Sequence, residues 1–456
     1  MGEIPLDGHL LPVQSVIMIR TLRWWMICHW LTALCTQSVT AAPLKVLAIG
    51  DSLTEEYAFE LPFSAPDSDP LDANMKNWLE ILSSHRATTF TAGLYDSSLL
   101  AYSDLRNGGY QFNYGVPGFR TSDWIAVCKS TFLDLLSGDL VTSLRYPTRQ
   151  VLLDHLDNVN AVVIFLGGND VESVYGATFN DAQTPTLLAK TVTNLAYIHD
   201  FVRDHAANLP IIIATVPDVG ATEKIASTYT DPAKRAIARA RIATMNASII
   251  TMANGRGAKV ARIDTVTDRI FDQIPMSLNG TDFIYPPSPE NAPRPVFCKD
   301  GFHPATMVQA LIADEILAAL NLATGRNIPR LSNREILGPV LGLNPDQPYL
   351  DWAAGVGGFD QNPDGDGLPN LAEFVLATSP TLADSPFIFE ADGQMSFATS
   401  AAGLEFATIN LEESTTLVNW LSVPLSRITV GPDGVWQISP SAAASTFYRL
   451  AAVPRP

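Results

Sequence analysis

A serine, a histidine and an aspartate stand where they could carry out acyl transfer. Ser52 comes shortly after the apolar run 46–49, and His303 follows Asp300 by three residues in a polar segment. Acyl transfer needs a hydroxyl made nucleophilic by a base, and a further group that orients the base. The sequence therefore predicts Ser52 as the nucleophile, His303 as the general base and Asp300 as the acceptor that fixes the His303 tautomer.

The same reaction needs hydrogen-bond donors for the oxyanion, and two glycine-containing segments offer them. Gly118 ends the run Phe112-Asn-Tyr-Gly-Val-Pro-Gly118, and Asn169 follows two glycines in Phe165-Leu-Gly-Gly-Asn169. We expect the backbone amides of Ser52 and Gly118 and the side-chain amide of Asn169 to form an oxyanion hole. Loss of one such donor typically lowers the rate ~10²–10³-fold.

Each of these five residues also has a simpler possible role. Ser52 could be the N-cap of the next helix, and Gly118 could serve a turn with positive φ. Asn169 could stabilise a turn, and Asp300 could cap a helix beside a surface His303. It is their joint occurrence that favours catalysis over these separate roles.

The elements that must position these residues are strands of one sheet. Between about residues 44 and 325, apolar runs alternate with helical patterns such as 186–205 and 232–253. The runs are continuous and rich in β-branched residues, which is typical of strands buried on both faces of a parallel sheet. The predicted strands are 45–49, 161–166, 210–216 and 259–263. This order indicates a doubly wound α/β sheet, and such sheets bind ligands at the carboxyl ends of their strands.

Four segments together resemble the sequence blocks of the SGNH hydrolases, also called GDSL esterases and lipases. They are Gly50-Asp-Ser-Leu53, Gly118, Gly167-Gly-Asn-Asp170 and Asp300-x-x-His303, in the usual order. The resemblance covers roughly residues 44–325 and implies a flavodoxin-like three-layer α/β/α sandwich, ester hydrolysis without a catalytic cofactor, and the residue roles given above. The chain has no Gly-x-Ser-x-Gly segment, which disfavours the nucleophile elbow of the α/β-hydrolases.

The segment between Ser52 and Gly118 is rich in aromatic residues. They are Tyr57, Phe59, Phe63, Trp78, Tyr95, Tyr102 and Tyr110. Their rings could stack on sugar rings at the mouth of a pocket, or they could be ordinary packing residues.

Residues 1–42 have the pattern of a secretory signal peptide, with Met18 as an alternative start. Arg20 and Arg23 precede the apolar run 24–34, and small residues around position 41 suit a cleavage site. A membrane anchor is the alternative, although a spanning helix needs ~20 apolar residues. We expect an extracytoplasmic protein, located in the periplasm, on the cell surface or outside the cell.

Cysteines and charge limit the partners. After export, Cys128 and Cys298 would be in an oxidising compartment. They could form a disulfide with each other there, or they could remain as two buried thiols. The net charge is −18, which argues against nucleic acid, because phosphate binding needs clustered Lys and Arg.

The sequence beyond residue 327 has a different composition. Residues 43–327 are expected to form the hydrolase domain, 328–359 a linker, 360–384 a calcium loop and 385–456 a small all-β accessory module. The loop 362–373 has the ligand spacing of an EF-hand, although no entering helix is evident before it. The expected Ca²⁺ ligands are Asn362, Asp364, Asp366, the Leu368 carbonyl, Asn370 and Glu373. Calcium would be structural, and the alternative is an acidic turn.

The expected function is that of a secreted serine esterase that forms an acyl-enzyme from short-acyl or carbohydrate acetyl esters. Lipid ester hydrolysis, as by a lipase or thioesterase, is one alternative. A surface-binding protein with a vestigial hydrolase domain is an alternative of another class. The accessory module could attach the protein to a cell surface or a glycan.

Overall fold

The computed structural model of the chain describes residues 42–57, 75–98, 100–180, 184–272, 275–284, 294–391, 393–441, 443 and 446–456. The predicted signal peptide up to residue 41, and the aromatic residues Phe59 and Phe63, lie outside these ranges.

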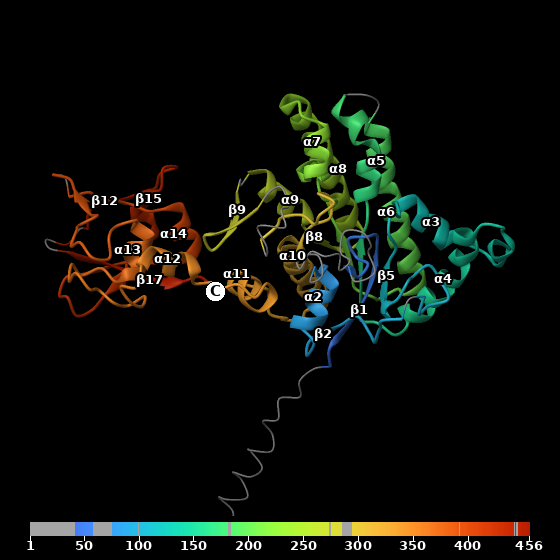
Figure 1. The fold of residues 1–456 in the computed structure, drawn as a ribbon, viewed down its shortest axis with the longest axis horizontal. Helices are drawn as coiled ribbons and strands as arrows, with labels where there is room; N and C mark the ends of the chain where they lie inside the picture. The colour runs from blue at the N-terminus through green and yellow to red at the C-terminus, as the bar shows by residue number, and fades with distance from the viewer. Residues whose placement is uncertain are drawn as a thin grey trace, which may run out of the picture. The chain divides into compact units, whose positions relative to one another are not determined.

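Six parallel strands form the main sheet of the α/β domain, by which we mean residues 43–343 (Figure 1). β2 pairs with the start of β1 and β5 with its end, and β6, β7 and β8 follow on the other side. When β2 and β5 are counted as one position, the order is the 2-1-3-4-5 order of flavodoxin-like sheets. The strands are β1 (Leu44–Gly50), β2 (Phe90–Thr91), β5 (Asn113–Gly115), β6 (Ala161–Phe165), β7 (Ile211–Ala214) and β8 (Lys259–Ala261).

The predicted parallel α/β sheet is confirmed, and its central strands are buried on both faces. In β1, Val46 and Ala48 belong to one hydrophobic cluster, and Leu47 and Ile49 belong to another on the opposite face. This alternation explains why the strand reads as one continuous apolar run.

Helices cover both faces and complete three layers. The helices that contribute to the cluster of Val46 are α2 (Trp78–His85), α9 (Ile263–Asp272) and α10 (Thr306–Thr324). Those that contribute to the cluster of Leu47 are α3 (Thr121–Lys129), α4 (Leu140–Leu156), α5 (Gly168–Phe179), α6 (Thr184–His205), α7 (Glu223–Thr228) and α8 (Pro232–Gly255). Helix α10 is long and apolar enough to cross a membrane by length and composition, but 61% of its most apolar window is buried inside the protein.

Local sequence signals explain where these helices begin. Asn77 accepts from the amides of Leu79 and Glu80, while the Glu80 carboxylate accepts from the Asn77 amide, which is a capping box for α2. Asp231 caps α8, and Pro232 occupies its first position, where its missing N–H costs nothing.

Short elements complete the α/β domain. They are the hairpin strands β3 (Tyr95–Asp96) with β4 (Gly109–Tyr110) and β9 (Met276–Leu278) with β10 (Thr281–Phe283), and the 3₁₀ helices η3 (Phe132–Leu136) and η4 (Val219–Ala221).

The segment 328–359, predicted as a linker, contributes to two hydrophobic cores. It contains α11 (Asn333–Glu335), the π-helical turn η6 (Ile336–Val340) and α12 (Gln347–Ala353). Ile336 and Leu337 are buried with α10, whereas Tyr349 and Ala353 belong to the core of the C-terminal module, by which we mean residues 347–456. Burial of these side chains stabilises the conformation of the segment.

The described part of the C-terminal module contains two small antiparallel sheets and the three short helices α12, α13 and α14. One sheet has the order β11-β12-β16-β15 and the other β14-β13-β17. The elements are α13 (Asn370–Leu376), β11 (Ile388–Phe389), β12 (Met395–Ala398), α14 (Ala401–Phe406), β13 (Ala407–Ser414), β14 (Leu421–Ser422), η7 (Leu425–Arg427), β15 (Ile428–Val430), β16 (Val435–Ile438) and β17 (Phe447–Pro454). The small antiparallel sheets predicted for residues 385–456 are therefore present, with α14 as an addition that the sequence did not indicate. Helix α13 lies in the segment 360–384 that was predicted as a calcium loop.

Candidate active site

Ser52 lies two residues beyond the end of β1, at the edge of the sheet where the parallel strands end. Gly50 of β1 aligns with Gly115 of β5 and with Phe165 of β6. Since neighbouring parallel strands end at the same edge, the segments that follow them lie next to one another. The sheet thus brings together the turns that hold the predicted nucleophile and the predicted oxyanion donors.

Ser52, His303 and Asp300 form one hydrogen-bonded chain. The Ser52 hydroxyl is 2.8 Å from Nε2 of His303. Nδ1 of the same ring is 2.5 Å from Oδ2 of Asp300. A ring with its proton on Nδ1 donates to Asp300 and accepts from Ser52, and the network favours this tautomer. Such a chain can raise the nucleophilicity of a serine hydroxyl.

Asp300 is oriented by the turn to which it belongs. Its Oδ1 accepts from the backbone amides of Phe302 and His303, both at 3.0 Å. Burial acts to raise the pKa of Asp300, but the hydrogen bond and charge of His303, together with the two amides, lower this pKa overall. Asp300 is therefore ionised at neutral pH and can stabilise a protonated His303.

Two backbone amides beside the Ser52 hydroxyl have no hydrogen-bond acceptor among the described residues. Within the described ranges, neither the N–H of Ser52 nor that of Gly118 donates a hydrogen bond. Gly118 has a φ of +71°, and a Cβ there would meet nothing within 4 Å. The backbone conformation therefore favours glycine at this position, and the space beside it is open.

Asn169 lies at the start of α5 and is partly engaged. Its Nδ2 donates to the Phe119 carbonyl at 3.0 Å, which uses one of the two N–H groups of the amide. The second N–H is available to a ligand. Ser52 and Asn169 line the pocket beside the serine, whereas Gly118 is not part of its lining.

Asp170 joins the turn after β5 to the turn after β6. Its carboxylate accepts from the Thr121 amide at 2.9 Å and from the Thr121 hydroxyl at 2.6 Å. With the bond from Asn169 to Phe119, this contact fixes the two turns that carry the expected oxyanion donors. The sequence analysis gave no role to Asp170, although it belongs to the segment Gly167-Gly-Asn-Asp170. Its position next to Asn169 was the only sequence feature that pointed to this positioning role.

Asp51, and not Ser52, makes the cap-like hydrogen bond after β1. Its Oδ1 accepts from the Leu53 amide at 3.0 Å, and residues 52–54 form a turn. The expectation that Ser52 could be a helix N-cap is therefore wrong, because its hydroxyl bonds to His303 instead. Burial raises the pKa of Asp51 to about 7, so this carboxyl beside the nucleophile changes charge near neutral pH.

A narrow pocket opens beside Ser52. Its volume is about 40 Å³, and most of its lining is apolar, including Ile263, Val266, Val308 and Ile312. The pocket is therefore small, and its lining suits an apolar group.

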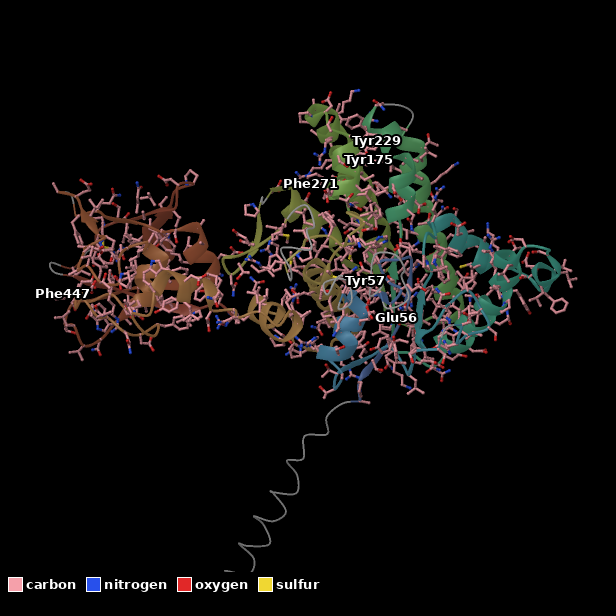
Figure 2. All side chains as sticks on the ribbon, viewed as in Figure 1. Glu56, Tyr57, Tyr175, Tyr229, Phe271 and Phe447 are labelled. Atoms are coloured by element: carbon pink, nitrogen blue, oxygen red, sulfur yellow. The ribbon has the colours of Figure 1, made fainter. Side chains whose placement is uncertain are left out.

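Four of the aromatic residues between Ser52 and Gly118, namely Tyr57, Trp78, Tyr95 and Tyr110, make contacts inside the α/β domain. Tyr57 and Trp78 are fully buried, and Figure 2 shows Tyr57 inside the α/β domain. The Tyr57 hydroxyl donates to the Pro304 carbonyl at 3.0 Å and accepts from Gln309. Tyr95 and Tyr110 contact each other on the β3–β4 hairpin. None of these four lines the pocket beside Ser52.

Cys128 and Cys298 do not form the disulfide that the sequence left open. Both thiols are buried. Cys128 packs in the cluster of Leu47, whereas Cys298 packs with Tyr57 and Ala305 and donates to the Pro304 carbonyl.

Of the predicted metal ligands, the structure brings three carboxylates together. They are Asp364, Asp366 and Glu373, and one oxygen from each carboxylate lies within 4.8 Å of one oxygen from each of the other two. Asn362 accepts from the Gly365 amide in the same loop. Asn370 is buried, and its Nδ2 donates to the Gly358 carbonyl at 3.2 Å, so its side chain is partly used by the backbone.

Comparison with known proteins identifies the α/β domain. The family model of the GDSL-like lipase/acylhydrolases matches residues 46–316. An acetylxylan esterase from Geobacillus stearothermophilus is similar in structure, with 14% identity and a TM-score of 0.32 over 64% of this chain and 98% of that one. A family 3 carbohydrate esterase from Clostridium thermocellum is also similar in structure, with 14% identity and a TM-score of 0.31 over 62% of this chain and 99% of that one.

A further similar structure is an extracellular lipase from Streptomyces rimosus, with 16% identity and a TM-score of 0.33 over 62% of this chain and 100% of that one. None of the curated proteins compared with the chain matches it.

Proposed function

The chain belongs to the GDSL-like lipase/acylhydrolase family and is a carboxylic ester hydrolase, and we propose that it is an exported serine esterase that acts on short-acyl esters. The observation that carries the catalytic part is the hydrogen-bonded chain Ser52–His303–Asp300. The narrow apolar pocket beside Ser52 supports the preference for short acyl groups.

In the proposed first half-reaction, Ser52 Oγ attacks the carbonyl carbon of the ester. The hydroxyl proton passes to Nε2 of His303, and Asp300 stabilises the imidazolium that forms. The negative oxygen of the tetrahedral intermediate accepts from the amides of Ser52 and Gly118 and from the side chain of Asn169. His303 then gives its proton to the leaving alcohol, and an acyl-serine remains.

In the second half-reaction, water replaces the alcohol. His303 takes a proton from the water as it attacks the acyl-serine, and the same donors hold the second oxyanion. Collapse of this intermediate returns the proton to Ser52 Oγ and releases the carboxylic acid. No catalytic metal or organic cofactor enters this scheme.

The acyl pocket favours acetyl and similar groups over long chains. A fatty acyl chain has much more apolar surface to bury than this small pocket offers. Acetyl esters of carbohydrates are therefore within the proposed substrate class. A panel of acetate, butyrate, octanoate and palmitate esters, together with acetylated polysaccharide, tests this directly. Preference for palmitate would instead support lipid ester hydrolysis.

The proposal includes export and an accessory role for the C-terminal module. The pattern of residues 1–42 supports export, and amino-terminal sequencing of secreted protein tests it. The module holds none of the residues assigned to catalysis, which supports a separate role such as attachment to a cell surface or glycan. Retention of the full chain on insoluble polysaccharide, in the presence and absence of soluble competitor, tests that role.

A further inference from the structure

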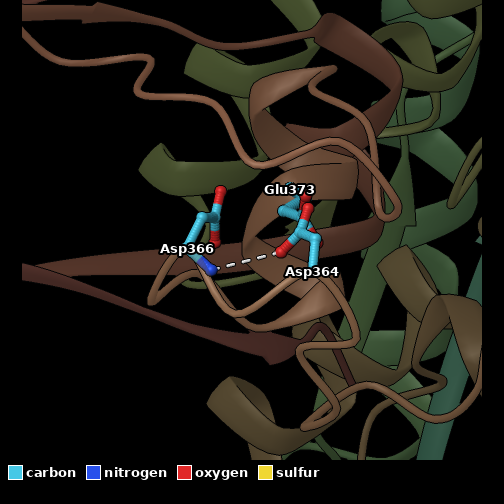
Figure 3. A group of neighbouring side chains, drawn as sticks. All are labelled: Asp364, Asp366 and Glu373. Carbon is cyan, nitrogen blue, oxygen red and sulfur yellow. Dashed lines mark hydrogen bonds between the residues drawn. The ribbon is translucent and has the colours of Figure 1, made fainter.

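Three carboxylates converge in the C-terminal module, far along the chain from the active-site residues. Asp364 and Asp366 lie in a loop, and Glu373 lies in the first turn of α13. Figure 3 shows the three side chains grouped together, and one oxygen from each carboxylate lies within 4.8 Å of one oxygen from each of the other two. Like charges at this separation repel unless a cation or proton lies between them.

Glu373 is the decisive member of the group. Its side chain is fully buried, and both carboxylate oxygens lack a hydrogen-bond partner. One oxygen of Asp364 is also buried without a partner. In the described part of the chain, no Lys, Arg or His forms an ion pair with any of the three. Buried carboxylates are normally paired or bound to a metal, because an isolated buried charge is very unfavourable.

The loop is held so that its carboxylates stay side by side. Asp364 Oδ1 accepts from the Asp366 amide at 3.3 Å, and Asp366 Oδ1 accepts from the Leu368 amide at 2.8 Å. Asn362 Oδ1 accepts from the Gly365 amide at 2.9 Å. Each bond uses one side-chain oxygen in the turn, and the Asp364 oxygen that is left over is the unpartnered one.

Helix α13 connects this group to the core of the module. All seven of its residues, Asn370–Leu376, are buried. Phe374 contacts the rings of Tyr349, Trp352 and Phe406. Because Glu373 is next to Phe374 on this helix, an ion held by Glu373 would fix the loop to the core.

We propose that Asp364, Asp366 and Glu373 bind one Ca²⁺, and that this ion determines the stability of the C-terminal module. The ligands are all oxygen atoms, which suits a hard cation, and Ca²⁺ accepts six to eight of them in flexible geometry. Asn362 and the Leu368 carbonyl are the further ligands available from the same loop. No entering helix directly precedes the loop, since α12 ends at Ala353.

Isothermal titration of the full chain with Ca²⁺, after removal of ions by a chelator, tests the site. We expect one ion per chain, and we expect Glu373→Gln to weaken binding by about tenfold or more, because affinity depends on ligand charge. Asp360→Asn is the matched control, since Asp360 is exposed and outside the group. No binding by the wild-type chain, or equal binding by Glu373→Gln, would overturn the proposal.

Thermal unfolding gives a second readout that does not depend on esterase activity. In chelator, Glu373→Gln should unfold at the same or a higher temperature than the wild type, since it removes an unpaired buried charge. In Ca²⁺ the order should reverse, because only the wild type gains stability from the ion. The same order of melting temperatures in both conditions would show that Glu373 has only a packing role and would contradict the proposal.

Discussion

The hydroxyl of Ser52 lies 2.8 Å from Nε2 of His303, although 251 positions of sequence separate the two residues. The contact exists because β1 and the loop before α10 meet at the carboxyl edge of one parallel sheet. Asp300 holds the far side of the ring at 2.5 Å. Ser52, His303 and Asp300 can therefore each be tested for their own contribution to turnover.

Replacement of Asp300 tests the orientation of the base. Asp300→Asn keeps an oxygen that can accept from the amides of Phe302 and His303 but removes the charge that faces Nδ1. We expect kcat to fall by about 10³–10⁴-fold with little change in thermal stability. Steady-state kinetics with p-nitrophenyl acetate measures the loss. A fall of less than tenfold would remove Asp300 from the catalytic group.

Asn169→Ala tests the oxyanion hole. Loss of one donor should lower kcat by about 10²–10³-fold and leave KM nearly unchanged, because the donor acts mainly in the transition state. Asn180→Ala at the other end of α5 is the control and should keep full activity. If KM rises while kcat stays constant, Asn169 binds the ground state and does not serve the oxyanion.

Val308→Ala tests whether the pocket beside Ser52 selects the acyl group. Val308 lines this pocket and is buried, so truncation enlarges the space for the acyl chain. We expect the ratio of kcat/KM for hexanoate to that for acetate to rise by about tenfold. Val162→Ala, which truncates a buried valine of the opposite core cluster, should leave the ratio unchanged. Equal ratios in both variants would place the acyl group elsewhere.

Buried carboxyls near β1 should make the folded chain less stable as pH rises. Burial raises the pKa of Glu56 to about 8 and the pKa of Glu80 to about 7. Between the ordinary pKa of a glutamate and these values, the folded chain binds more protons than the unfolded chain. The free energy of unfolding therefore falls as pH rises through this window.

Glu56→Gln removes the largest part of this pH dependence. Denaturant unfolding at pH 5.5 and 8.5 should show a smaller difference in the variant than in the wild type, by an amount on the order of a few kcal/mol. The lowered pKa of Asp300 acts in the opposite direction, at lower pH. A wild-type chain that gains stability between pH 5.5 and 8.5 would contradict this account.

The sequence was sufficient for four of the six strands of the main sheet and for the residues of the hydrogen-bonded chain Ser52–His303–Asp300, but β2 and β5 were not predicted. β1, β6 and β7 contain continuous apolar runs because both faces of these strands are buried, and such runs are visible without a structure. β8 is a shorter strand that begins with the exposed Lys259. Ser52 and Asn169 follow β1 and β6, whose ends meet at one edge, so their proximity follows from the sheet order. His303 lies in the loop before α10, and its contact with Ser52 is seen only in the structure.

Contacts that depend on tertiary packing could not be read from the sequence. The bond from Asp170 to Thr121 joins two turns whose separation depends on the register of β5 and β6. The segment 328–359 has the glycines and prolines of a linker, but Ile336 and Tyr349 are held by two different cores. Burial of Glu373 likewise depends on how α13 packs against its neighbours.

The most direct test of the central claim is turnover of p-nitrophenyl acetate by Ser52→Ala. Circular dichroism and thermal unfolding of the variant should match those of the wild type, which shows that the fold is intact. We expect kcat to fall by at least about 10³-fold, because the variant lacks the hydroxyl that forms the acyl-enzyme in the proposed scheme. A folded Ser52→Ala protein with wild-type turnover would contradict the assignment. A wild-type chain without turnover on any ester of the panel would favour a binding protein with an inactive hydrolase domain.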